Sequence, residues 1–148
     1  MIRIAGSTFA FGDMSLEESC RILRDMGFKV ADVGASGWSL FKEWVPQQVV
    51  QNIDDPDGEA ERILRVTGDN GLEVSELFIC DFGHAINHPD PDKRAETRDK
   101  YAKMAKIAQK AGFESMMMLP GDIHEDLGQT FEQAFQTGGP GIAERPGG

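Results

Sequence analysis

The sequence predicts an α/β fold in which helices cover a parallel sheet. Short apolar runs typical of buried strands alternate along the chain with longer amphipathic segments typical of helices. The order is strand, helix, strand, helix, strand, helix, strand and the beginning of a fourth helix, with short turns from each helix to the next strand. Such alternation favours parallel strands joined by helical crossovers.

The first βα unit is expected within residues 2–27. The run IRIAGSTFAF starts as a buried strand and breaks into a loop at Gly6. Ser15 and Glu18 have capping-box spacing, which predicts the start of a helix, and Gly27 is expected to end it. The apolar face of this helix is predicted to consist of Leu16, Cys20, Leu23 and Met26.

The second unit begins with a short strand from Val30 to about Val33, followed by a long loop that carries Trp38. A helix over residues 59–71 is indicated by helical spacing of apolar residues, and a third strand is expected over residues 72–79. The apolar positions of that helix are Ala60, Ile63 and Leu64.

The strongest helix signal covers residues 91–111, and a fourth strand is expected over residues 113–119. The apolar stripe of the helix is predicted to consist of Tyr101, Met104, Ala105 and Ala108. A further helix is expected to start near Gly128, with Leu127, Phe131 and Phe135 at four-residue steps.

Composition places the chain among soluble globular proteins. It has 148 residues, of which 40% are hydrophobic and 27% charged, enough for one domain with a core. The net charge of −10 opposes nucleic-acid binding, because phosphate contacts need clustered Lys and Arg. No apolar run approaches the ~20 residues that span a bilayer. Cys20 and Cys80 lack CxxC spacing and a preceding secretory leader, so we expect buried thiols and a cytoplasmic protein.

Two architectures satisfy the pattern, an open doubly wound sheet and a closed eightfold barrel. The length favours the open sheet, because a complete barrel takes about 250 residues. The loops favour the barrel. The turn GSTFAFGDMS after the first strand is not the GxGxxG turn of a dinucleotide-binding sheet, and the long polar and aromatic segments follow strands, where a barrel keeps its active site.

Four runs together resemble the xylose isomerase-like TIM barrel superfamily, which contains sugar phosphate isomerases and epimerases. They are IRIAGSTFAF, GFKVADVGASGW, GLEVSELFI and NHPDPDKRAETRDKYAKMAKIAQKAGFESMMMLPG. The resemblance extends from Ile2 to about Ala134 and implies a partial barrel of about four βα units. In the endonuclease branch of the superfamily the fourth strand closes in His-Pro-Gly, whereas this chain has Leu119 before Pro120 and Gly121. The resemblance therefore favours the sugar isomerase and epimerase branch.

That branch holds one divalent metal ion, such as Mn, Mg, Zn or Co, with ligands on the later strands of the barrel. The resemblance therefore implies that the metal ligands lie beyond Gly148, and that no residue here takes a catalytic or metal-binding role. We expect residues 1–136 to form the amino-terminal half of a barrel and residues 137–148 to be a Gly/Pro-rich flexible tail. This organisation predicts a truncated or frame-shifted gene product, with an evolved small protein as the alternative.

Five residues after the predicted strands are candidates for binding a sugar. Phe9 and Trp38 can stack on the apolar face of a sugar ring, or they can simply cover the rim of the core. Polar side chains follow the third and fourth strands, and we expect Asp81, His84 and His124 to position sugar hydroxyls. A metal site of His84, Asp122 and His124 is an alternative, against a reading as solvated loop residues.

Two features inside the strands also need an explanation. Asp32 lies within the second strand, where a buried carboxylate needs a partner; we expect it to anchor a hydrogen-bond network or to pair with Lys29. Met116, Met117 and Met118 are expected to alternate between the barrel interior and the helix interface rather than to bind a soft metal.

The sequence thus predicts a sugar isomerase- or epimerase-like protein that is inactive as this fragment. The alternative is a non-catalytic binding or assembly module, and an open nucleotide-binding sheet ranks last. The expected ligand is a sugar or sugar phosphate, without nucleic acid or membrane. Because a half barrel exposes two sheet edges and its interior, we expect a homodimer or a separate second-half partner.

Overall fold

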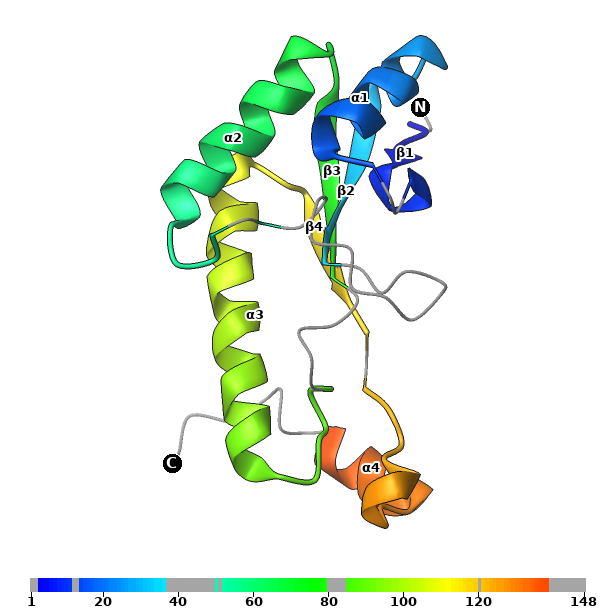
Figure 1. The fold of residues 1–148 in the computed structure, drawn as a ribbon, viewed down its shortest axis with the longest axis vertical. Helices are drawn as coiled ribbons and strands as arrows, with labels where there is room; N and C mark the ends of the chain where they lie inside the picture. Colours follow the sequence, from blue (N-terminus) through cyan, green and yellow to red (C-terminus); the bar gives the residue numbers. More distant parts are fainter. Residues whose placement is uncertain are drawn as a thin grey trace. The chain divides into compact units, whose positions relative to one another are not determined.

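The computed structural model describes residues 3–11, 14–36, 50, 52–79, 85–119 and 121–138. Within them the chain is a mixed α/β protein with a four-stranded parallel sheet and four α-helices, so the predicted fold class is confirmed at this level (Figure 1). The elements are β1 (Gly6–Ser7), η1 (Thr8–Phe11), α1 (Leu16–Asp25), β2 (Val30–Ser36), α2 (Pro56–Asp69), β3 (Glu73–Ile79), α3 (Pro91–Ala111), β4 (Ser115–Met118), η2 (Glu125–Leu127) and α4 (Phe131–Gly138).

The four strands lie side by side in chain order, β1-β2-β3-β4, and every pair is parallel. β1 is much shorter than predicted. It contains only Gly6 and Ser7, while Ile4 precedes it as a 74% exposed residue rather than a buried strand position. The Thr8 side chain extends the pairing beyond β1, because its Oγ1 accepts a hydrogen bond from the Gly34 amide at 2.9 Å.

The chain divides into two compact units. The first comprises Met1–Asp81 and Ala102–Met118, which include the sheet, α1, α2 and the last residues of α3. The second comprises Phe82–Tyr101 and Leu119–Gly148, which include the first part of α3, η2 and α4. Each unit is described by itself below.

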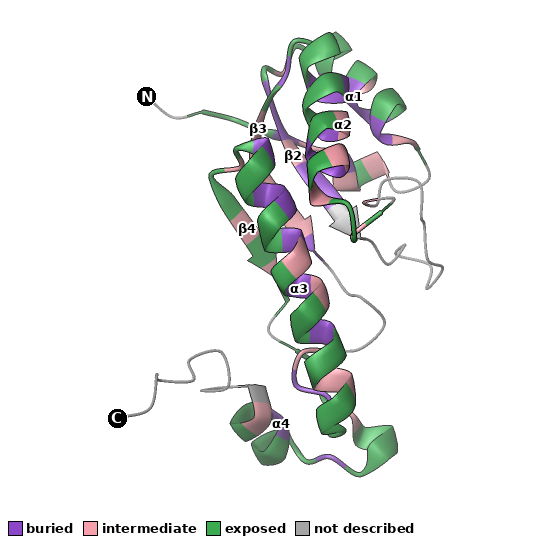
Figure 2. Cartoon of the chain, turned by 90° about the vertical axis from the view of Figure 1, so that its left-hand side faces the viewer, coloured by how far each residue is buried: buried purple, intermediate pink, exposed green. Residues whose placement is uncertain are grey.

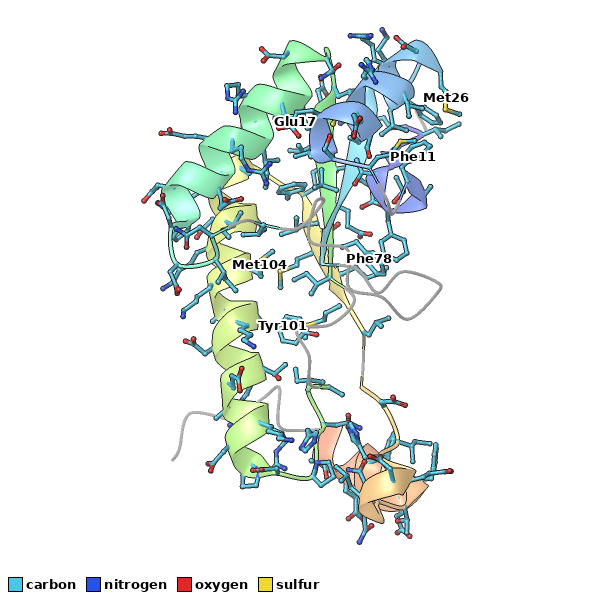
Figure 3. All side chains as sticks on the ribbon, viewed as in Figure 1. Phe11, Glu17, Met26, Phe78, Tyr101 and Met104 are labelled. Atoms are coloured by element: carbon cyan, nitrogen blue, oxygen red, sulfur yellow. The ribbon has the colours of Figure 1, made fainter. Side chains whose placement is uncertain are left out.

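In the first unit the helices pack on one face of the sheet, and Figure 2 shows α2 in front of the strands. The residues of β2 and β3 that point to this face are almost completely buried, namely Ala31 (0%), Val33 (1%), Leu77 (0%) and Ile79 (0%). Met104 of α3 points toward the sheet and is fully buried (Figure 3). This helix-covered face contains the core of the unit.

Helix α1 confirms most of the predicted apolar face and its cap. Leu16, Cys20 and Leu23 are buried, and the Ser15 side chain and Glu18 form the capping box. Met26 is 64% exposed because the helix ends at Asp25 and Met26 is its C-cap. Cys20 is a free buried thiol, and its burial raises the pKa to about 11.

The predicted stripes of α2 and α3 each contain one error. Leu64 is 44% exposed, and Val66 is buried in its place. Ala105 is exposed, whereas Ile107, which was not predicted, is fully buried. Residues two positions apart point to nearly opposite sides of a helix, so in both helices the buried stripe is rotated from the predicted one, and packing against the sheet sets this rotation.

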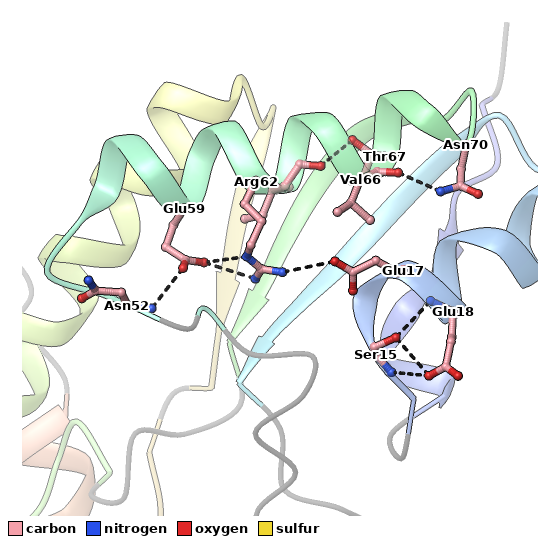
Figure 4. A network of polar contacts seen from close by, with 10 residues as sticks. Ser15, Glu17, Glu18, Asn52, Glu59, Arg62, Val66, Thr67 and Asn70 are labelled. Carbon is pink, nitrogen blue, oxygen red and sulfur yellow. Dashed lines mark hydrogen bonds and ion pairs between the residues drawn. The ribbon is translucent and has the colours of Figure 1, made fainter.

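A polar network joins α1 to α2 (Figure 4). Arg62 forms an ion pair with Glu59 at 3.2 Å and reaches Glu17 of α1 at 4.0 Å. Glu59 is only 5% exposed and also accepts a hydrogen bond from the Asn52 amide at 3.1 Å. Because a buried carboxylate needs hydrogen-bond partners, the Arg62 guanidinium and the Asn52 amide together compensate the burial of Glu59.

No helix among the described residues is long and apolar enough to cross a membrane. The predicted tail and the loop that carries Trp38 lie outside the described residues, apart from the last turn of α4, which ends at Gly138.

Candidate functional site

Three of the five predicted sugar-binding residues, Trp38, Asp81 and His84, lie outside the described residues. Of the other two, Phe9 belongs to the first unit and His124 to the second. The two units therefore offer two separate groups of candidate side chains, one on the sheet and one around Asn87.

The sheet face opposite the helices carries a line of polar side chains. Val33 pairs with Leu77 in the register of β2 and β3, and both point to the helices. Because successive side chains of a strand point to opposite faces, the preceding residues, Asp32 and Glu76, point to the other face. We call this side the helix-free face, because α1, α2 and the end of α3 all pack on the other side of the sheet.

Serines of the edge strands complete the line. Ser7 of β1 is in register with Asp32, and Ser115 of β4 is in register with Glu76. The Ser115 hydroxyl donates a hydrogen bond to Glu76 Oε2 at 3.0 Å, and the Ser7 side chain bonds the Asp32 carboxylate. Ser7, Asp32, Glu76 and Ser115 form what we call the polar row.

Asp32 occupies an unfavourable position for a charge. Burial raises the pKa of its carboxyl above the ordinary value, the hydrogen bond with Ser7 opposes that change, and the negative charge of Glu76 adds to it. Its Oδ1 is buried and has no hydrogen-bond partner in the described part of the chain. The expected network around Asp32 therefore exists, but its charged neighbour is Glu76 and not Lys29.

Because the pKa of Asp32 is raised in the folded chain, we expect this residue to lower the free energy of unfolding as the pH rises. Above the ordinary value of 3.8 the unfolded chain releases this proton, while the folded chain retains it up to the raised pKa. Within that window the folded state binds more protons, so its stability falls with increasing pH. Asp32→Asn should abolish this loss, and urea unfolding across the window should show the variant gaining stability relative to the wild type. If the difference in unfolding free energy between Asp32→Asn and the wild type did not change with pH, the raised pKa of Asp32 would be contradicted.

An apolar layer lies next to the polar row, toward the carboxyl ends of the strands. The rings of Phe9 and Phe78 meet edge to face, with centroids 5.2 Å apart and an interplanar angle of 87°. Gly34, in register with Phe78, leaves room for this contact, since a Cβ there would lie 3.3 Å from the Phe9 Cβ. Met117, also in register with Phe78, is 45% exposed. Phe9 thus packs on the sheet itself while remaining partly accessible.

At the amino-terminal side of the polar row, Arg3 forms ion pairs with Glu73 and with Glu114, the latter at 3.3 Å. Its side chain is 50% exposed, so each pair contributes little to stability. Within the first unit this arrangement brings the segment before β1 close to the beginnings of β3 and β4.

In the second unit Asn87 organises the residues that follow the fourth strand. Its Nδ2 donates to the Asp122 carbonyl at 2.7 Å and to the Ala134 carbonyl at 3.2 Å, and its Oδ1 accepts from the Asp122 amide at 2.9 Å. Gly121 has a positive φ of 124°, and a Cβ there would collide with the Asn87 amide group. We call this arrangement the Asn87 clamp. It explains why the loop NHPDP begins with asparagine.

His124 lies beside the clamp. Its amide donates to Gln129 Oε1 at 3.1 Å, and Gln129 in turn donates to the Asn87 carbonyl at 3.2 Å. The ring centroids of His124 and His88 lie 4.7 Å apart. His88 is 5% exposed, and its Nδ1 accepts a hydrogen bond from the Asp90 amide. His124 Nε2 is buried without a hydrogen-bond partner in the described part of the second unit. Its ring therefore packs beside His88, which leaves little of it for a ligand.

No group of three or more His, Cys, Asp and Glu side chains among the described residues could hold a metal ion. The alternative site of His84, Asp122 and His124 includes a residue outside the described part.

Sequence reasoning did not identify Ser7, Glu76 or Ser115 as site residues, nor the role of Asn87. Glu76 was detectable in principle, because it is a carboxylate that directly precedes the apolar residues Leu77, Phe78 and Ile79 of the same strand. The serines became recognisable only through the strand register, which sequence spacing does not give. Comparison with known proteins supplies no further assignment: no protein-family model matches the chain, and no curated protein is similar to it.

Proposed function

We propose that the chain forms part of a (βα) barrel of the xylose isomerase-like type and acts in a sugar or sugar phosphate isomerase or epimerase. In this proposal the described residues supply part of the substrate wall, while the metal and the catalytic groups are supplied by residues outside this chain. The order of the strands, together with the one-sided packing of the helices, is the observation that supports it best.

A doubly wound sheet reverses its strand order at a switch point and carries helices on both faces. Here the order is β1-β2-β3-β4 without reversal. A barrel is built from strands added in one direction with all helices outside, so its interior corresponds to the helix-free face. This reasoning favours the barrel type over the open nucleotide-binding sheet.

The position of the aromatic layer supports a sugar as the ligand. Phe9 and Phe78 lie toward the carboxyl ends of β1 and β3, the side on which barrels bind substrates. Aromatic faces and edges contact the apolar C–H surface of a sugar ring, and the loops that carry Trp38, Asp81 and His84 follow the same strand ends.

A divalent metal in such enzymes polarises the substrate carbonyl while acids and bases transfer protons. Because the family resemblance places the metal ligands on the later strands of the barrel, we expect this chain to bind a sugar without turning it over. The second candidate is a non-catalytic assembly module. It is favoured by the exposed apolar residues of the second unit, since Leu127, Phe131 and Phe135 are 53%, 71% and 73% exposed.

Ligand-observed NMR with fructose 6-phosphate and free ketoses would test the proposal. We expect saturable binding by the wild type and about fivefold weaker binding by Phe9→Ala, the scale of a lost aromatic contact of about 1 kcal/mol. Phe131→Ala removes an equally large but exposed ring from α4 and should leave binding unchanged. If no sugar binds, or if both variants weaken binding equally, the assembly module becomes the better reading.

A further inference from the structure

Within the described part of the chain, Phe9 of η1 packs over Gly34 and Phe78 on the helix-free face, but no α-helix covers the polar row or Met117. Parallel sheets occur almost only with both faces covered. Here the helix-covered positions are fully buried, whereas Asp32, Glu76 and Phe78 are half-buried and Met117 is 45% exposed. The edge strands β1 and β4 have one neighbour each. A strand-bearing chain could therefore both pair with these edges and cover this face.

The charge of the face restricts what can cover it. Asp32 and Glu76 point to this face from the polar row, where Ser7 and Ser115 are their hydroxyl neighbours. Glu73 and Glu114, which pair with Arg3, are out of phase with the polar row along their strands and do not add to its charge. The buried Oδ1 of Asp32 has no hydrogen-bond donor, although its carboxylate is partly desolvated.

A second copy of the same chain is a poor fit to this surface. Pairing β4 of one copy with β1 of the other would cover both faces, but it would bring two polar rows together. Like charges placed opposite each other across an interface oppose association, and a low-dielectric interior strengthens this repulsion. A partner with Lys or Arg at this level would instead neutralise Asp32 and Glu76 and supply the missing donor.

We propose that the helix-free face is the docking surface for a different protein chain, one that pairs strands with β1 and β4 and presents Lys or Arg side chains to the polar row. This inference rests on the sheet and its charges. It does not depend on a sugar being the ligand, so the NMR experiment and the following one can fail independently.

A charge-reversed copy of the chain can serve as the probe. The Asp32→Lys, Glu76→Lys variant has the same strands and apolar layer but carries cations in the polar row. Sedimentation at neutral pH should show a one-to-one complex between this variant and the wild type. The complex should be at least about tenfold tighter than either homodimer, because only the mixed pair places opposite charges together.

The matched control is Glu61→Lys, Asp69→Lys, which changes the net charge equally at exposed positions of α2. It should not associate with the wild type more tightly than the wild type does with itself. If the control and the probe bound the wild type equally tightly, the proposal would be overturned, since net charge and not the polar row would then cause the association. A wild-type homodimer as tight as the mixed pair would also overturn it and identify a second copy as the occupant.

Circular dichroism establishes whether the lysine probe folds. If it does not, Asp32→Asn, Glu76→Gln removes the repulsion with almost unchanged side-chain volumes. This neutral variant should self-associate more tightly than the wild type. No increase in its self-association, or no complex with a folded lysine probe, would contradict the proposal.

Discussion

Replacing Asn87 with alanine is expected to release the residues of the second unit that follow the fourth strand. The substitution leaves the Asp122 amide and the carbonyls of Asp122 and Ala134 without their partner, and Asn87 itself is only 5% exposed. Each buried backbone group left unpaired costs about 1–3 kcal/mol. We expect a local loss of about 3 kcal/mol, because water can reach some of the freed groups.

Hydrogen exchange followed by mass spectrometry would measure this effect. Peptides from residues 121–138 should exchange about 100-fold faster in Asn87→Ala, whereas peptides from β2 and β3 should change little. Asn70→Ala is the matched control, because Asn70 is the C-cap of α2 in the first unit and donates to the Val66 carbonyl at 2.8 Å. If Asn87→Ala accelerated amide exchange equally in β3, the stabilising effect of the Asn87 clamp would not be confined to the second unit.

The sequence was sufficient to predict the class of fold, because periodicity and capping are local properties. Ser15 and Glu18 form the predicted capping box, and α3 has the predicted bounds. The errors occur where packing sets which side of a helix is buried, as in α3, where Ile107 is buried and Ala105 is exposed. They also occur at β1, where an apolar run does not reveal that only two residues pair with β2.

The candidate site was less predictable, because it depends on register between strands far apart in the sequence. Asp32 attracted attention as a carboxylate inside a strand, but its relation to Glu76 requires that Val33 and Leu77 be paired. Asn87 was recognised only as part of a motif. Its role depends on contacts with Asp122 and Ala134, 35 and 47 residues further along the chain. The sugar-binding roles of all five predicted residues, Phe9, Trp38, Asp81, His84 and His124, stay predictions.

The two faces of the sheet should respond very differently to truncation of a side chain. Leu77 is 0% exposed under the helices, in register with Met116. Leu77→Ala should lower the free energy of unfolding by about 3 kcal/mol, since it leaves a cavity that the packed helices cannot fill. That loss is a large fraction of the stability of about 5–15 kcal/mol typical of a domain.

Met117→Ala is the control for that experiment, because Met117 is 45% exposed on the helix-free face. In the isolated chain it should cost less than about 1 kcal/mol, as expected for a partly exposed position. Urea unfolding of both variants measures the contrast. Equal losses would mean that the helix-free face is already packed in the isolated chain, and a docking partner would then have no surface to cover. A large difference would instead mean that one side of this parallel sheet is stabilised by the chain's own helices while the other stays available to a partner.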